Sequence, residues 1–303
     1  MATPVRNVMP VVLDELARFE LAIKKQIGAG SAFHLDACEQ TITAANEGVL
    51  HSKLLQIVMG ATPTEAGFMM LPMVAGMMTA TIISGQITSK TGKYKMFMVI
   101  GPTLLALGYF YLTSFNADTQ YWQASIGMIL IGLGLGQLMQ TLTLAAQNSV
   151  PASEVGVATA SATFFRQMGG TLGVAVFISI LFNNLADTIP AASKRTDVQA
   201  GLKEAMQDPK VIGDPNNAEF LKGLQGGNMA DLAGKLNTDS SFLNNLDPRL
   251  ARPFLIGFAD AGVTVFAIAG AVVAVAIVIA IFTKAPALRT KSAVQEAAAA
   301  NAH

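Results

Sequence analysis

Three glutamines lie on one face of a long uncharged stretch of the chain. Gln137, Gln140 and Gln147 are spaced so that on an α-helix they share a face with Leu144, and Thr141 flanks it. Amides donate and accept hydrogen bonds without carrying a charge, so such a face can bind varied ligands along a translocation path. The same face can instead bond to a neighbouring helix, at about 1 kcal/mol or less per contact in a membrane. The residues alone leave both roles open.

One arginine interrupts a region that is otherwise free of charge. Arg166 is the only charged residue between Glu154 and Asp187. A charge at membrane depth is costly, and its usual partner is a water-filled cavity, a carboxylate or a backbone carbonyl. The simpler alternative is that Arg166 extends to the membrane surface as an anchor, since a long uncharged run still follows it. The same two alternatives apply to Gln167.

No other group of residues has the spacing of a catalytic or metal site. His34, Asp36 and Cys38 alternate along the chain, but no second cluster completes a metal site around them. The stretch Gly132–Gly136 lies in the middle of a predicted helix and follows no strand, so it is not a nucleotide-binding loop. We therefore expect neither an enzyme nor a bound metal or cofactor.

The elements that carry these residues have the length of membrane-spanning helices. Only 13% of the residues are charged, against roughly 25% in ordinary soluble domains. A hydrocarbon core about 30 Å thick needs about 20 helical residues, and backbone groups in lipid must bond within their own segment. The sequence therefore predicts an all-α membrane protein with about five transmembrane helices. They are expected at Ala66–Thr88, Met96–Ser114, Trp122–Ala146, Val157–Leu185 and Leu255–Phe282.

The lysines of one short loop predict the orientation of these helices. Lys90, Lys93 and Lys95 lie between the first two spans with no acidic residue among them, and basic residues also follow the last span. The positive-inside rule places both regions in the cytoplasm. Gly92 is expected to form the turn. In the simplest interpretation, the lysines anchor the loop to anionic headgroups, at about 1 kcal/mol each.

The expected organisation follows from these spans. Residues between the fourth and fifth helices form a long extracytoplasmic segment, since long loops translocate largely regardless of their charge. The expected parts are a soluble-like N-terminal segment (1–53), transmembrane helices one to four (54–186), the extracytoplasmic loop (187–252), the last transmembrane helix (253–283) and a cytoplasmic tail (284–303).

Two pairs of glycines have the spacing of close helix contacts. Gly132 and Gly136 are one turn apart, as are Gly169 and Gly173, and this spacing lets the backbones of neighbouring helices approach each other. We interpret both pairs as packing sites. Asp260 lies at the expected outer start of the last helix, and we interpret it as a cap because a carboxylate favours the positive end of the helix dipole.

Three passages carry a resemblance to a known family. They are GQITSKTGKYK at Gly85–Lys95, the glycine-rich run Gly127–Pro151, and Ala162–Phe182, which contains Phe-Arg-Gln-x-Gly-Gly. The first is similar to the cytoplasmic loop signature of the major facilitator superfamily. The second and third resemble the twelfth and thirteenth helices of its fourteen-helix drug:proton antiporter branch. The resemblance begins near Leu54 and corresponds to the C-terminal portion of that family, helices ten to fourteen.

The resemblance implies a function as well as a fold. It implies efflux of small amphipathic compounds by proton antiport across a bacterial inner (cytoplasmic) membrane, with the lipid bilayer as surroundings. It also implies a conformational role for the cytoplasmic loop, in which we place Gly85, Lys90, Gly92, Lys93 and Lys95. Nucleic acid is not an expected partner, because the formal net charge is zero.

The part of the family that this sequence does not resemble leads to two further expectations. Transport in this fold needs two halves that rock about a site near the bilayer midplane. We therefore expect a truncated or frame-shifted transporter fragment that is inactive alone and lacks an N-terminal half. The alternative is a non-transporting accessory or interaction protein, in which the amphipathic stretch Val11–Ile27 binds a partner.

Overall fold

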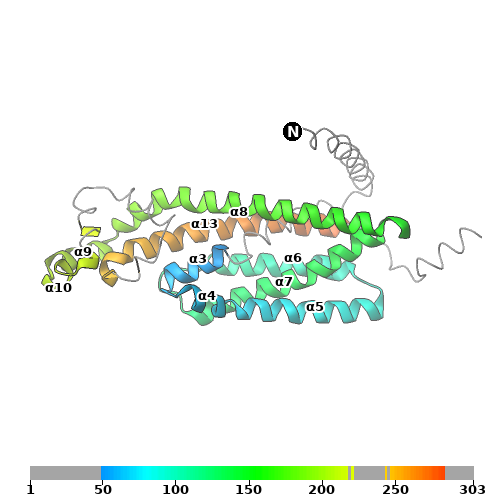
Figure 1. Ribbon diagram of the computed structural model, residues 1–303, viewed down its shortest axis with the longest axis horizontal. Helices are drawn as coiled ribbons and strands as arrows, with labels where there is room; N and C mark the ends of the chain where they lie inside the picture. Colours follow the sequence, from blue (N-terminus) through cyan, green and yellow to red (C-terminus); the bar gives the residue numbers. More distant parts are fainter. Residues whose placement is uncertain (1–48, 218–219, 222–242, 244–245, 284–303) are drawn as a thin grey trace, which may run out of the picture.

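The computed structural model describes residues 49–217, 220–221, 243 and 246–283, and all regular structure in them is helical (Figure 1). Within these residues, five helical spans are long and apolar enough to cross a membrane. The prediction of an all-α membrane protein with about five transmembrane helices is confirmed. The elements are α3 (Val49–Val58), α4 (Pro63–Met69), α5 (Leu71–Thr91), α6 (Lys95–Leu112), α7 (Tyr121–Asn148), the short 3-10 helix η1 (Ala152–Glu154), α8 (Val155–Ser193), α9 (Thr196–Gln207), α10 (Pro209–Ile212) and α13 (Pro248–Phe282).

The first span consists of two helices, α4 and α5, which meet at Met70. Thr62 caps α4: its hydroxyl accepts a hydrogen bond from the Glu65 N–H (3.3 Å), and the Glu65 carboxylate accepts one from the Thr62 N–H (2.9 Å). Pro72 lies in the first turn of α5, where a missing N–H leaves no helical hydrogen bond unmade. The proline therefore begins a helix instead of interrupting one.

Helices α8 and α13 are longer than a membrane requires. They contain 39 and 35 residues, or about 58 and 52 Å at 1.5 Å per residue, against a hydrocarbon core of about 30 Å. Helix α8 continues to Ser193, past the boundary expected at residue 186. That boundary was the first charged residue, Asp187, and a charged residue can mark the end of an apolar run without ending the helix. The expected extracytoplasmic loop therefore begins as helix and contains α9 and α10.

The start of α13 differs from the expectation in the same way. The helix begins at Pro248 instead of residue 253, and the Asp247 side chain accepts a hydrogen bond from the Arg249 N–H (2.9 Å) as its cap. Asp260 lies well inside α13 and is exposed. Its interpretation as the helix cap was therefore wrong.

Helix α7 lies between two neighbours, and α13 joins them to α8. Helix α7 packs against α5 on one side and α6 on the other, while α13 packs against both α6 and α8 (Figure 1). The contact between α7 and α8 is much less extensive than the contact between α8 and α13. The long helices therefore follow one another across the bundle in the order α5, α7, α6, α13, α8.

Glycines on two faces of α7 allow its neighbours to approach closely. A Cβ atom on Gly132 or Gly136 would collide with the backbone carbonyl of Met73 or Met77 on α5. A Cβ atom on Gly134 would lie 2.7 Å from the backbone oxygen of a glycine on α6. Backbone atoms cannot move aside as a flexible side chain can, so these positions accept no larger residue.

The second glycine pair lies on α8. Gly173 is buried within this helix, and Gly169 is half-buried. Their role in packing remains a prediction.

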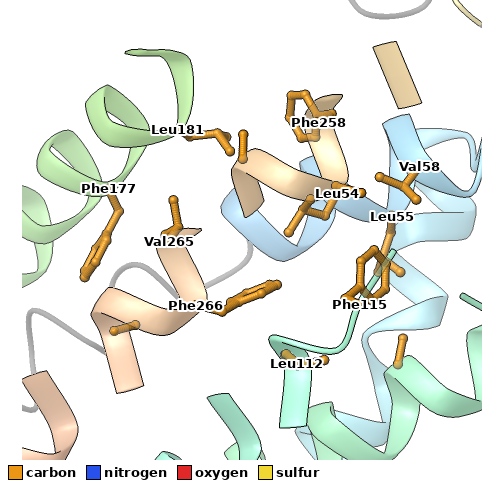
Figure 2. Packing of buried hydrophobic residues seen from close by; sticks show 14 of the residues in the cluster. Leu54, Leu55, Val58, Leu112, Phe115, Phe177, Leu181, Phe258, Val265 and Phe266 are labelled. Carbon is orange, nitrogen blue, oxygen red and sulfur yellow. The ribbon is translucent and has the colours of Figure 1, made fainter. Parts of the chain in front are cut away.

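The apolar core lies around the inner face of α13 (Figure 2). Phe266 is 2% exposed and its ring lies 6.4 Å from the ring of Tyr109 on α6. Residues of α3, among them Leu54, belong to the same cluster, as does Phe115 after α6. Phe177 of α8 also belongs to it, so this core connects α3, α6, α8 and α13.

Ion pairs join the start of α13 to the α6–α7 loop and to the start of α10. The Arg252 guanidinium of α13 donates two hydrogen bonds, of 2.7 and 2.8 Å, to the carboxylate of Asp118 in the α6–α7 loop. The Arg249 guanidinium donates to Asp247 (3.0 Å) and to Asp208 at the start of α10 (3.0 Å). These arginines lower the pKa values of all three carboxyl groups below the ordinary range.

The Asp118–Arg252 pair predicts a pH dependence of stability. Hydrogen bonds from Arg252 hold the pKa of Asp118 below its ordinary 3.8. The stabilisation is therefore complete above that value and is lost as the pH falls through the lower pKa of the folded protein. In detergent, Asp118→Asn should lower stability by at most about 1 kcal/mol near neutral pH, because the pair is exposed, and by less towards pH 3. Thermal unfolding of both proteins from pH 6 to pH 3 measures this, with the exposed Asp260→Asn as the matched control; a constant difference across that range would contradict it.

Candidate functional site

A groove of about 570 Å³ lies between α5 and α7. The side chains around it are mainly hydroxyls, amides and small apolar groups, and none of them is charged. The lining residues are Thr81, Ser84, Gly85, Thr88 and Ser89 on α5, and Met139, Gln140, Thr141, Thr143, Leu144 and Gln147 on α7. The structure therefore brings together Gln140 and Thr141, which were predicted to line a substrate path, with Gly85, which was assigned to the cytoplasmic loop.

The hydroxyls of this groove bond partly to helix backbones. Thr81 donates to the carbonyl of Met77 (2.8 Å) on its own helix and to that of Gly136 (2.9 Å) on α7. Thr141 donates to the carbonyl of Gln137 (2.6 Å). Such bonds satisfy the hydroxyl hydrogen and leave oxygen lone pairs as acceptors towards the groove. The amide of Gln140 is exposed and adds both a donor and an acceptor.

Gly85 lies on α5, two turns before the loop that leads to α6. A Cβ atom at this position would lie 3.4 Å from Oε1 of Gln140, so the absence of a side chain leaves room for that amide. Gly85 thus belongs to the groove by position.

The third predicted path residue on α7, Gln137, does not line the groove. Its side chain is 9% exposed, and its buried Oε1 has no hydrogen-bond partner in the described part of the chain. An unsatisfied buried oxygen is costly.

A polar seam joins α7 to α8 beside the groove. One terminal nitrogen of Arg166 donates to Thr143 Oγ1 (3.0 Å), and one turn further along α7 the Gln147 amide donates to Thr159 Oγ1 (3.0 Å). Arg166 is half-buried, whereas Gln167 is exposed on another face of α8. The structure therefore places Arg166 at the edge of the groove through Thr143, and it separates Gln167 from it.

The loop between α5 and α6, which was predicted to be cytoplasmic, begins at a glycine that ends α5. Gly92 ends α5 with a φ of 68°, in the left-handed region that glycine favours, so it does form the predicted turn. Lys90, Lys93 and Lys95 are all exposed. Tyr94 between them is 2% exposed, and Asn148 at the end of α7 donates to its hydroxyl (3.5 Å).

Tyr94 was not among the predicted residues. Its signal in the sequence was a large aromatic residue inside an otherwise basic loop. In the structure it ties that loop to the end of α7.

Two N-terminal features weighed from the sequence are the alternating residues that were rejected as a metal site and the amphipathic stretch. His34, Asp36, Cys38 and Val11–Ile27 all lie outside the described residues. Among the residues that the structure does describe, no group of three His, Cys, Asp or Glu side chains is arranged to hold a metal ion.

The helices define a multi-pass membrane protein, and the groove is an uncharged, largely apolar recess between two of its spans with a few polar groups in its walls. Residues 41–174 match the sequence profile of the Major Facilitator Superfamily. This part of the chain is therefore similar to members of that superfamily. The match begins before Leu54, where the resemblance was expected to start, and it contains both walls of the groove and Arg166.

Several curated proteins are similar to this chain. The "Tetracycline resistance determinant" of Streptomyces rimosus is 31% identical over 209 residues, which cover 68% of this chain and 57% of that protein. The "Multidrug transporter protein MdtP" of Bacillus subtilis is 38% identical over 127 residues, covering 42% and 23%. The "Tetracenomycin C resistance and export protein" of Streptomyces glaucescens is 28% identical over 233 residues, covering 76% and 39%. The chain thus spans 57% or less of the length of these relatives.

A solved structure supports the fold. The crystal structure of the Escherichia coli fucose:proton symporter FucP (N162A) superposes with a TM-score of 0.53 at 18% identity, covering 86% of this chain and 51% of that protein. At this level of identity the likeness concerns the fold alone.

Proposed function

We propose that this chain forms one wall of the path of a secondary transporter that exports small amphipathic compounds. The observation that carries the proposal is the groove between α5 and α7. It places hydroxyls and amides, without any charge, between two membrane-length helices. Polar groups at membrane depth are tolerated where they face protein or a water-filled cavity, and a few placed polar groups in an otherwise apolar site are typical of small-molecule recognition.

The names of the relatives support the proposal that the exported compounds are drug-like. Three of them are named for resistance to, or export of, drugs and antibiotics. We extend the proposal to exchange for protons, because Ala162–Phe182 resembles the thirteenth helix of the fourteen-helix antiporter branch. We also place the chain in the cytoplasmic membrane of a bacterium. In this proposal, Lys90, Gly92, Lys93 and Lys95 limit the movement of the cytoplasmic helix ends.

The proposal assigns this chain a binding wall and not a complete transport cycle. Alternating access requires two halves that move against each other around the site, and the described residues supply five spans. The remaining wall would come from an N-terminal transporter half. Nothing in the described residues favours the alternative of an accessory protein.

Binding and transport by the purified 303-residue chain test the proposal together. Tetracycline should bind saturably to the chain in nanodiscs, and Gln140→Leu should weaken it about fivefold, the value of roughly one hydrogen bond. Gln86→Leu is the matched control, because Gln86 is an exposed amide on α5 that does not line the groove. Vesicles containing only this chain should show no proton-driven ethidium efflux.

Each result has a clear reading. Binding that is absent, or equally weakened by both leucine variants, would contradict the groove. Ethidium efflux would instead contradict the need for a second half.

A further inference from the structure

The guanidinium of Arg166 is incompletely bonded in the structure. Of its five N–H donors, one bond is made, to Thr143 Oγ1 (3.0 Å). The Nε atom is buried and has no hydrogen-bond partner among the described residues. Thr143 itself lines the groove, so the unsatisfied cation lies at the α8 side of that groove.

No carboxylate in the described part of the chain compensates this charge. The described ion pairs do not include Arg166. Along the chain the nearest charges are Glu154, directly before α8, and Asp187 within it. They are about 18 and 32 Å away along the axis at 1.5 Å per residue. Helix α7, which carries Thr143, contains no charged residue. A half-buried cation without a counter-charge favours an anion that arrives from outside the chain.

We infer that Arg166 is an anion-recognition subsite of the groove. The geometry assigns it the carboxylate, sulfonate or enolate of an amphipathic compound whose uncharged body lies against Gln140 and Thr141. A guanidinium matches such groups well, because its parallel N–H donors bind two oxygens at once. This inference rests on the proposed function and narrows it, since it names the charge that the bound compound carries.

Two fluorescent probes of the same shape test the inference. The anionic probe 1-anilinonaphthalene-8-sulfonate differs from neutral N-phenyl-1-naphthylamine by its sulfonate group. Saturable binding of each is titrated to the purified chain in nanodiscs of zwitterionic lipid, and the proteins compared are wild type, Arg166→Gln, Arg166→Lys and Lys203→Gln. The last variant removes one positive charge from an exposed position on α9 and serves as the matched control.

The expected result is specific to the sulfonate. Arg166→Gln should weaken binding of the anionic probe at least about tenfold, as for a charge-assisted bond, and leave the neutral probe within about twofold. Arg166→Lys should retain part of the preference, because it keeps the charge but loses the paired donors. Lys203→Gln should change neither probe.

Other results overturn the inference. If Arg166→Gln weakens both probes equally, Arg166 supports the groove structurally. If it changes neither, the anion at Arg166 is a lipid phosphate or absent. In both cases, binding of the neutral probe shows that the groove itself stands. If neither probe binds to the wild-type chain, the proposed function fails and the subsite fails with it.

Discussion

Gly136→Leu should destabilise the bundle by about 3 kcal/mol or more, at the upper end of overpacking effects. The reason is that a Cβ atom at this position would collide with the backbone carbonyl of Met77 on α5. Helices in a bilayer gain their association from close packing and hydrogen bonds and not from hydrophobic burial. A separation of α5 from α7 also removes the bond from Thr81 to the Gly136 carbonyl, so the groove between these helices should be lost with the contact.

Unfolding of the purified chain by sodium dodecyl sulfate in mixed micelles measures this loss. Gly156→Leu is the matched control, because a Cβ atom there would have no neighbouring atom within 4 Å. A Gly136→Leu protein as stable as Gly156→Leu would show that α5 and α7 do not pack at this glycine.

Phe266→Ala should cost about 3 kcal/mol, within the range for removing a buried aromatic ring. Phe266 is 2% exposed, pairs with the ring of Tyr109, and lies in the cluster where α3, α6 and α13 meet (Figure 2). The loss comes from van der Waals contacts around the cavity that the ring leaves. Because neither Phe266 nor Tyr109 lines the groove, binding by molecules that remain folded should be unchanged.

The same unfolding measurement, followed by a binding titration, checks this prediction. Phe282→Ala on the same helix is the control, since its ring is 80% exposed. If both alanine variants lost stability equally, the loss would come from lipid contact and not from the core. Weakened tetracycline binding by folded Phe266→Ala would show that the core and the groove are coupled.

The spans were predictable because lipid imposes a strict length and composition on them. The ends of the helices were less predictable, because outside the bilayer they depend on local hydrogen bonds. Asp247 caps α13 through the Arg249 N–H, whereas the sequence pointed to Asp260. Asp260 stands at the start of the uncharged run, and the apolar boundary of a helix is not its structural end.

The groove was predictable only in part. The shared face of Gln137, Gln140 and Gln147 follows from helical spacing, but which of these amides meets the groove depends on where α5 approaches α7. Gln137 is buried and does not line the groove, whereas Gln140 and Gln147 both line it. Gln140 lies against Gly85, and Gln147 also donates a hydrogen bond to Thr159 on α8. For Arg166, the two roles weighed from the sequence were a surface anchor and a cavity partner. The bond to Thr143 depends on the placement of α8 beside α7, which no local pattern encodes.

The extra length of α8 and α13 allows movements inside the bundle to be detected at the far ends of these helices. Each is longer than the hydrocarbon core is thick, and α9 packs against both of them. A small tilt of either helix inside the membrane becomes a larger displacement at its far end. Spectroscopic labels on α9 would therefore report the motion of the bundle from a distance, without a substitution near the groove.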